Sequence, residues 1–236
     1  MEDRHRLSST KNPAVNPGPS AFISARSHPS PVARAASQAA VAPGETVLFL
    51  TVELCALAFR RDDWSKSNIV ATALFGDGAS GALLSTDGEG PAIVASGEHT
   101  WPESLDVMGW EVADDGFSAV FSRDIPQLVT TQLRDVASEF LARHRLTLGD
   151  IDRFVCHPGG AKVVAALERA FGLGQGALVG AWGVLRDYGN MSATTVMFVL
   201  ERMLAAARAT GETWDRALMN ALGPGFTAGF LVLDNR

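Results

Sequence analysis

The chain has 236 residues, 47% of them hydrophobic, and a formal net charge of −6 from 20 Lys and Arg against 26 Asp and Glu. This length supports one large domain or two small ones with a substantial core, and the acidic balance argues against a nucleic-acid partner. The longest apolar runs, such as Val47 to Leu50, fall short of the roughly 20 residues that a membrane-spanning helix needs. We therefore expect a soluble globule that binds neither nucleic acid nor membrane.

Cysteine and histidine usage points away from metal and disulfide chemistry. The two cysteines, Cys55 and Cys156, are too few for a disulfide framework or a zinc cluster, and the histidines lack metal-ligand spacing. No phosphate-loop or dinucleotide fingerprint occurs, and the N-terminus lacks the apolar segment of a secretory signal. We expect a cytoplasmic protein with no metal and no cofactor.

The chain begins with a segment whose apolar residues follow neither helical nor strand periodicity. Residues 1–32 are rich in Pro, Ser and Arg, which predicts a disordered leader. The Ala-rich residues 33–41 favour a helix, and Thr46 to Val52 predict a buried strand. The apolar stretch from Ile69 to Leu84 is interrupted by Gly76-Asp77-Gly78, and its Asp-Gly pair favours a tight hairpin turn between two strands.

The remaining elements alternate between helix and strand. Apolar residues at helical spacing predict a helix over Ile125 to Arg143, and a short strand follows at Arg153 to Cys156. A second helix is expected over Ala161 to Phe171, closed by Gly172. A third is expected over Met191 to Ala209, before Gly-interrupted strands within Ala217 to Asp234. This order predicts an α/β fold with helices layered against a mixed sheet.

Two residues at element boundaries are candidates for chemistry. His157 lies where a strand gives way to a Gly-rich loop, from which a side chain can reach a cleft, although a lone His there is commonly a surface or satisfied residue. Asn190 precedes an apolar helical run, so its ordinary role is an N-cap. The functional alternative is that both donate hydrogen bonds to a thioester carbonyl and stabilise the enolate formed on decarboxylation.

Other candidates also carry two interpretations. Phe75 is either a core residue or an apolar wall that desolvates a bound carboxylate, and Gly223-Pro224-Gly225 is either a plain turn or a close approach to a ligand. Cys55 is best interpreted as an unreactive thiol, because no nearby cation or helix N-terminus lowers its pKa. Cys156 is rejected as a nucleophile, since adjacent strand residues such as Cys156 and His157 point to opposite faces.

The order of five motifs is more specific than any one of them. They are Val52-Glu53-Leu54-Cys55, Ala73-Leu74-Phe75-Gly76-Asp77-Gly78-Ala79, His157-Pro158-Gly159-Gly160, Tyr188-Gly189-Asn190-Met191-Ser192 and Gly223-Pro224-Gly225. Together they resemble the chalcone and stilbene synthase family, the type III polyketide synthases, over residues 33–236. The resemblance implies a thiolase-like αβαβα fold, with 33–88 a remnant of the N-terminal half and 89–236 the C-terminal domain.

The resemblance also implies roles for individual residues. In the family a Cys-His-Asn triad decarboxylates malonyl-CoA and condenses the enolate onto a Cys-bound acyl chain; His157 and Asn190 match the triad His and Asn. The Val-Glu-Leu-Cys form resembles bacterial enzymes that make alkylpyrones or alkylresorcinols, and the second gatekeeping Phe of the plant enzymes is replaced near Ala119. The implied substrate-cavity residues are Phe75, Cys55, Gly159, Gly160, Ser192, Gly223, Pro224 and Gly225.

One departure bears on activity. The family's nucleophilic Cys would fall near residues 24–27, where this chain has none, so we expect an acyltransferase of acyl-CoA and malonyl-CoA, truncated and without its nucleophile. The expected partners are CoA thioesters and a second copy or another synthase chain. One alternative is a non-catalytic remnant or interaction subunit. The other is a ketoacyl carrier-protein synthase III-like enzyme, whose usual His-Gln-Ala-Asn differs from His157-Pro158-Gly159-Gly160.

Overall fold

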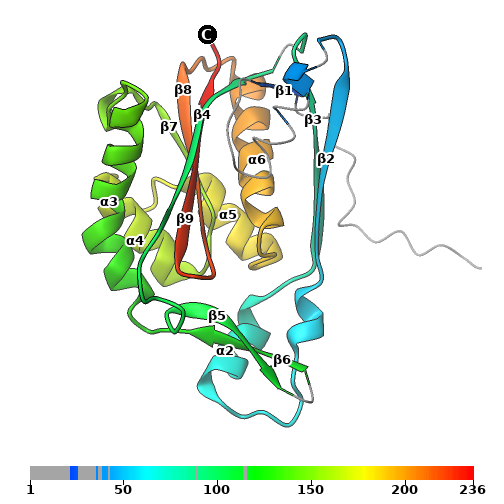
Figure 1. The fold of residues 1–236 in the computed structure, drawn as a ribbon, viewed down its shortest axis with the longest axis vertical. Coiled ribbons are helices and arrows are strands. Elements are labelled where there is room, and N and C mark those ends of the chain that lie inside the picture. Colours follow the sequence, from blue (N-terminus) through cyan, green and yellow to red (C-terminus); the bar gives the residue numbers. More distant parts are fainter. Residues whose placement is uncertain (1–21, 26–35, 37–38, 42, 89, 114–115) are drawn as a thin grey trace, which may run out of the picture.

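The computed structural model describes residues 22–25, 36, 39–41, 43–88, 90–113 and 116–236 (Figure 1). None of the helices in this part of the chain combines the length and apolarity that crossing a bilayer requires. The elements, in chain order, are β1 (Phe22–Ala25), β2 (Thr46–Glu53), η1 (Cys55–Ala58), α2 (Lys66–Leu74), β3 (Gly78–Ser85), β4 (Ala92–Thr100), β5 (Met108–Ala113), β6 (Gly116–Phe121), α3 (Ile125–Arg143), η2 (Leu148–Asp150), β7 (Arg153–Cys156), α4 (Ala161–Phe171), α5 (Val179–Tyr188), α6 (Thr194–Thr210), β8 (Arg216–Gly223) and β9 (Thr227–Asp234).

Among the described residues, seven strands form one mixed sheet in the order β2-β3-β1-β4-β9-β8-β7. The β2–β3, β4–β9 and β8–β9 pairs are antiparallel, whereas β1 is parallel to both of its neighbours and β7 is parallel to β8. A separate antiparallel hairpin consists of β5 and β6. The predicted α/β class with a mixed sheet is therefore confirmed.

Helices cover the C-terminal strands on both faces. On one face, Phe140 of α3 stacks on Phe230 of β9 at 5.2 Å between ring centroids, and Phe154 of β7 stacks on Phe171 of α4 at 4.9 Å. On the other face lies α6, and beyond it the β2–β3 pair, so that α6 is held between two parts of the sheet (Figure 1). Each fully buried Leu or Phe in these layers contributes about 1.5–3 kcal/mol.

The antiparallel β2–β3 pair is covered on one face only. Val47 and Phe49 pack toward the core, whereas Leu48, Leu50 and Val52 are 57%, 64% and 65% exposed. Their register partners on β3 are Leu83, Gly81 and Ala79. We call these six residues the outer face. A strand that is apolar on both faces is typical of one buried on both sides.

The prediction of a hairpin turn at Gly76-Asp77-Gly78 is wrong. The residues before it form α2, whose N-cap Ser65 accepts a hydrogen bond from the Asn68 N–H at 3.2 Å. The Asp77 side chain accepts from the Ala56 N–H at 2.7 Å, which ties this loop to η1 instead of closing a turn. Gly78 then begins β3, which pairs with β2.

Most other predicted elements are confirmed. The bounds of α3, β7 and α4 agree with those predicted, and α4 ends at Gly172 in the left-handed conformation with φ 70°. Strands β8 and β9 form the expected C-terminal pair, while α6 begins a few residues later than predicted. Phe22–Ala25, within the predicted leader, form β1, and residues 36 and 39–41 are helical. The rest of 1–41 lies outside the described residues.

Candidate active site

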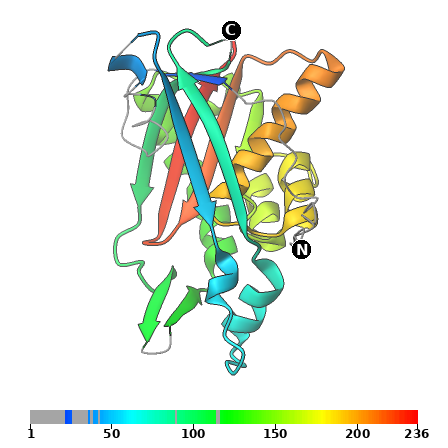
Figure 2. The same ribbon diagram turned by 90° about the vertical axis from the view of Figure 1, so that its right-hand side faces the viewer.

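A cavity of about 750 Å³ lies where the main sheet meets the β5–β6 hairpin and α2. Figure 2 shows the green hairpin and the cyan α2 segment beyond the same end of the strands. The volume falls within the roughly 300–1,000 Å³ of small-molecule sites. Its walls are mostly apolar, and its side chains with polar groups include Glu53, His157, Asn190, Ser192 and Thr227.

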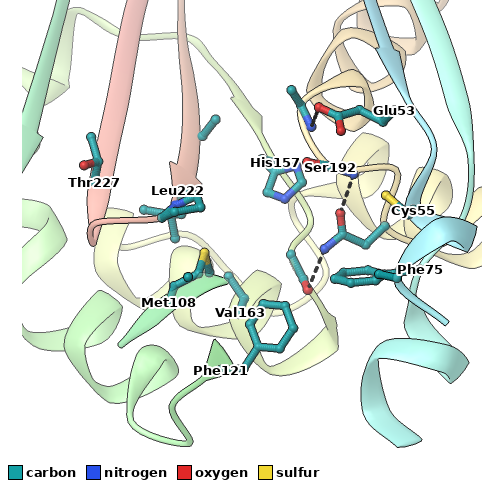
Figure 3. Close-up of a pocket in the computed structure, with 18 of the residues that line it drawn as sticks. Glu53, Cys55, Phe75, Met108, Phe121, His157, Val163, Ser192, Leu222 and Thr227 are labelled. Carbon is teal, nitrogen blue, oxygen red and sulfur yellow. Dashed lines mark hydrogen bonds between the residues drawn. The ribbon is translucent and has the colours of Figure 1, made fainter. Parts of the chain in front are cut away.

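His157 follows β7 and is 7% exposed. Its backbone N–H donates to the Asn220 carbonyl of β8 at 2.8 Å, which extends the parallel pairing by one residue and fixes the ring over the cavity (Figure 3). Burial lowers the pKa of the imidazole from 6.5 to about 4. The ring is therefore neutral at pH 7 and can donate one hydrogen bond.

Asn190 is fixed by its backbone and its side chain. Its N–H donates to the Leu74 carbonyl at 2.8 Å, and its own carbonyl accepts from the Gly76 N–H at 2.9 Å, forming a parallel bridge with Phe75. The side-chain Oδ1 accepts from the Ser192 N–H at 2.8 Å, and Nδ2 donates to the Gly159 carbonyl at 3.3 Å. One N–H of the amide thus points toward the loop after His157, and Nδ2 carries a second donor.

The N-cap interpretation of Asn190 is wrong. The cap of α6 is Ala193, and Ser192 between them adopts φ 52°. This left-handed residue bends the chain so that the Asn190 side chain bonds a loop amide instead of the first helical turn. Asn190 therefore does not cap α6, and it lines the cavity together with His157.

Two glycines permit the Phe75–Asn190 bridge. A β-carbon at Gly76 would lie 2.5 Å from the Tyr188 carbonyl oxygen, and one at Gly189 would lie 2.6 Å from the Leu74 carbonyl oxygen. Gly189 also has φ 73°, a conformation that favours glycine. The close approach of these two backbone segments therefore requires the Phe-Gly and Gly-Asn pairs of the motifs.

Two aromatic rings form one wall of the cavity. Phe75 meets Phe121, at the end of β6, edge to face with ring centroids 5.7 Å apart. Within the described residues Phe121 lines the cavity and Ala119 does not. Phe121 is not among the residues predicted from the sequence, although residues 119 and 121 share one face of a strand, and that spacing is the signal that points to it.

The other predicted residues divide into two groups. Phe75, Cys55, Gly159, Ser192, Gly223 and Pro224 line the cavity; Gly160 and Gly225 are not among its lining residues in the described part of the chain. Gly160 instead caps α4. Burial, reinforced by the Glu53 and Asp77 charges, raises the pKa of Cys55, which favours a protonated thiol.

Cys156 is not among the residues that line the cavity in the described part of the chain, which agrees with its rejection as a nucleophile. It is buried, and its pKa is raised by burial and by Glu168 of α4. Glu168, which no sequence motif indicates, accepts from the Leu178 N–H at 3.1 Å and from Trp182 Nε1 at 2.8 Å. This buried carboxylate holds α4 to the start of α5. Glu53, also missed, lines the cavity and accepts from the Ala193 N–H at 3.3 Å.

The layered arrangement defines a thiolase-like α/β fold of the polyketide synthase type. A brown algal enzyme, PKS-I from Ectocarpus siliculosus, superposes with a TM-score of 0.78 and 26% identity over 85% of this chain and 55% of its own. The crystal structure of 1,3,6,8-tetrahydroxynaphthalene synthase from Streptomyces coelicolor A3(2), at 23% identity, gives a TM-score of 0.77 over 86% of this chain and 58% of its own. The predicted thiolase-like fold is confirmed.

Residues 92–235 match the family model described as chalcone and stilbene synthases, C-terminal domain. The chain is 40% identical over 198 residues to 1,3,6,8-tetrahydroxynaphthalene synthase of Streptomyces peucetius subsp. caesius, and 32% identical over 197 residues to 3,5-dihydroxyphenylacetyl-CoA synthase of Amycolatopsis balhimycina. Each match covers 81% of this chain and 52% of the relative. The protein belongs to the chalcone and stilbene synthase family, the type III polyketide synthases, and spans about half the length of these curated relatives.

Proposed function

We propose that the cavity binds CoA thioesters and decarboxylates malonyl-CoA. His157 and Asn190 donate hydrogen bonds to the thioester oxygen, and Phe75 provides the apolar surface beside the departing carboxylate. The carbon–carbon bond breaks, carbon dioxide leaves, and the electron pair forms an enolate whose oxygen the two donors stabilise. Protonation of the enolate carbon gives acetyl-CoA. The observation that carries this proposal is the presence of a neutral His157 and a backbone-anchored Asn190 on one cavity.

Complete acyl transfer needs a nucleophile in addition to His157 and Asn190. Decarboxylative condensation of acyl-CoA with malonyl-CoA passes through an acyl-enzyme, which requires an activated nucleophile. The sequence has two cysteines. Cys156 is buried and does not line the cavity, and the raised pKa of Cys55 favours its protonated thiol. We therefore propose that this chain by itself stops at decarboxylation. Its two free thiols suit a reducing, cytoplasmic setting.

The test is acetyl-CoA formation from malonyl-CoA by the full chain, followed by liquid chromatography. Asn190→Asp keeps the acceptor for the Ser192 N–H but removes the amide donor, and His157→Phe fills the same space without a donor. Each should lower the rate at least about 100-fold. Asn235→Asp, at a polar contact near the C-terminus, serves as the matched control and should leave it unchanged.

The same assay tests whether the reaction stops at decarboxylation. Long-chain acyl-CoA is added together with malonyl-CoA, and the products are analysed by mass spectrometry. Acetyl-CoA without alkylpyrone is the expected result. An alkylpyrone formed by the purified chain would show that condensation proceeds without the family cysteine, and equal decarboxylation rates in wild type and Asn190→Asp would refute the role of the amide.

The outer face of β2–β3 favours a second candidate function, pairing with another synthase chain or a second copy. Leu48, Leu50 and Val52 form an exposed aliphatic strip on an edge strand, and such surfaces mark interaction sites. Light scattering of the full chain over a concentration series tests this. Leu50→Glu should shift an oligomer toward monomer, and a wild type that stays monomeric and binds no synthase chain would exclude pairing.

A further inference from the structure

One buried threonine holds the turn that carries Asn190. Thr195 lies in the first turn of α6, is 0% exposed and is not among the described residues that line the cavity. Its Oγ1 accepts a hydrogen bond from the Met191 N–H at 2.8 Å and donates one to the Ser192 carbonyl at 2.8 Å. Its backbone N–H donates to the same carbonyl at 3.1 Å. Thr195 therefore fixes both residues that follow Asn190.

The turn needs these bonds for two reasons. Met191 is 2% exposed, and a buried backbone N–H without an acceptor is costly, so the Thr195 hydroxyl supplies a required partner. Ser192 adopts φ 52°, a left-handed conformation that a residue with a side chain keeps only where its surroundings hold it. The bonds from Thr195 to the Ser192 carbonyl provide that hold. Removing the hydroxyl would leave an amide unpaired and would also release the turn.

The orientation of the Asn190 amide depends on this turn. Its Oδ1 accepts from the Ser192 N–H at 2.8 Å, and the oxygen and nitrogen of a carboxamide belong to one planar group. Fixing the oxygen therefore fixes the direction of the Nδ2 donors, one of which bonds the Gly159 carbonyl at 3.3 Å. Hydrogen bonds of 2.8 Å thus hold Ser192 on both sides, by its carbonyl to Thr195 and by its N–H to Asn190.

We propose that Thr195 is a positioning residue for decarboxylation, acting through Ser192 on the Asn190 amide. This inference rests on the proposed function, because it concerns the donor that the proposed function assigns to Asn190. Thr195 itself does not touch the substrate. Without its hydroxyl, the Met191 N–H loses its acceptor, the left-handed turn relaxes, and the Ser192 N–H no longer fixes the amide. The Asn190 donor is then displaced from the thioester oxygen.

The test measures malonyl-CoA decarboxylation by the full chain carrying Thr195→Val, because valine is close to threonine in shape but lacks the hydroxyl. The kcat should fall at least about 10-fold, since a misplacement of about 1 Å can cost about 100-fold in rate. The KM should change little, because the Asn190 donor acts most strongly on the enolate. Thr195→Ser keeps the hydroxyl and should retain most of the wild-type kcat.

Two controls separate positioning from stability. Thr194→Val removes the neighbouring hydroxyl, which is equally buried but meets Thr51 of β2, with 3.4 Å between the two Oγ1 atoms. This variant should keep the wild-type kcat. In an Asn190→Asp background the amide donor is already absent, so Thr195→Val should lower the rate little further. Melting curves from circular dichroism confirm that each variant is folded, and Thr195→Ala replaces Thr195→Val if the valine variant does not fold.

The outcomes distinguish this inference from the proposed function. A wild-type kcat in Thr195→Val, an equal loss in Thr195→Ser or in Thr194→Val, or the same fold-loss in the wild-type and Asn190→Asp backgrounds would each overturn the role of Thr195 alone. A wild-type chain that forms no acetyl-CoA would instead overturn the proposed function, and the inference with it.

Discussion

The C-terminal strands and the β2–β3 pair are both rich in apolar residues, yet only the C-terminal strands are covered on both faces. Strands β7, β8 and β9 lie between the α3–α4 layer and α6, whereas β2 packs against α6 and leaves Leu48, Leu50 and Val52 exposed. The cavity lies at the junction of the two regions. His157 and Asn190 come from the covered region. Glu53, Cys55 and Phe75 come from the end of β2, from η1 and from the end of α2. The cavity therefore depends on both regions, although only the first is covered on both faces.

The largest expected effect lies in the covered region. Phe230→Ala removes a ring that is 2% exposed and stacked on Phe140, so the free energy of unfolding should fall by about 3–5 kcal/mol. Urea denaturation followed by tryptophan fluorescence measures this loss. A change below about 1 kcal/mol would mean that this sheet is not packed as described.

A second prediction concerns how the stability of the protein changes at acid pH through His157. His157 has a folded pKa of about 4 against an ordinary value of 6.5, so its contribution to stability is complete above pH 6.5 and is lost as the pH falls toward 4. The loss should reach about 3 kcal/mol. Between pH 7 and 4, the unfolding free energy should depend less steeply on pH in His157→Phe than in wild type. Identical slopes would mean that the wild-type ring is exposed to solvent.

Local rules were sufficient for α3, β7 and α4 of the covered region. Helical spacing and a terminal glycine gave α3 and α4 with their observed bounds, because these signals depend on residues close in sequence. The α2 segment was misinterpreted as a strand because its fate depends on Ser65 as a cap and on Asp77 bonding the Ala56 amide. The Ser65 cap is a local signal three residues from Asn68, but an Asp-Gly pair carries no information about a partner as distant as the Ala56 amide.

The candidate site was predicted unevenly for the same reason. The motifs and the family resemblance identified His157, Asn190 and Phe75, all of which line the cavity. Phe121 and Glu53 were missed because their contacts join distant segments: β6 meets the end of α2, and β2 meets the turn before α6. Which residues converge across such distances follows from topology, and no single stretch of sequence encodes it.

A third prediction addresses the junction between the regions. Gly189→Ala would place a β-carbon 2.6 Å from the Leu74 carbonyl oxygen at a residue with φ 73°. We expect it to cost about 1–3 kcal/mol and to lower malonyl-CoA decarboxylation by displacing Asn190. Gly211→Ala is the matched control, because Gly211 has φ 70° but no atom within 4 Å of the added carbon. Equal costs for both variants would mean that the two backbones at Gly189 are not in close contact.

The smallest expected effect lies on the outer face. Leu50 is 64% exposed, so Leu50→Ser should change the unfolding free energy of the dilute monomer by less than about 0.5 kcal/mol. Chemical denaturation at low protein concentration measures this change. A loss comparable to that of Phe230→Ala would show that the outer face is buried within a single chain, and the contrast between the two regions would then disappear.

The most direct measurement is the infrared carbonyl stretch of isotope-labelled acetyl-CoA bound to the protein. Hydrogen bonds from His157 and Asn190 to one thioester oxygen should lower the stretching frequency relative to the free thioester in an apolar solvent. Asn190→Asp and His157→Phe should each return part of that shift. A bound carbonyl whose frequency is the same in all three proteins would contradict the convergence of these two donors on the substrate.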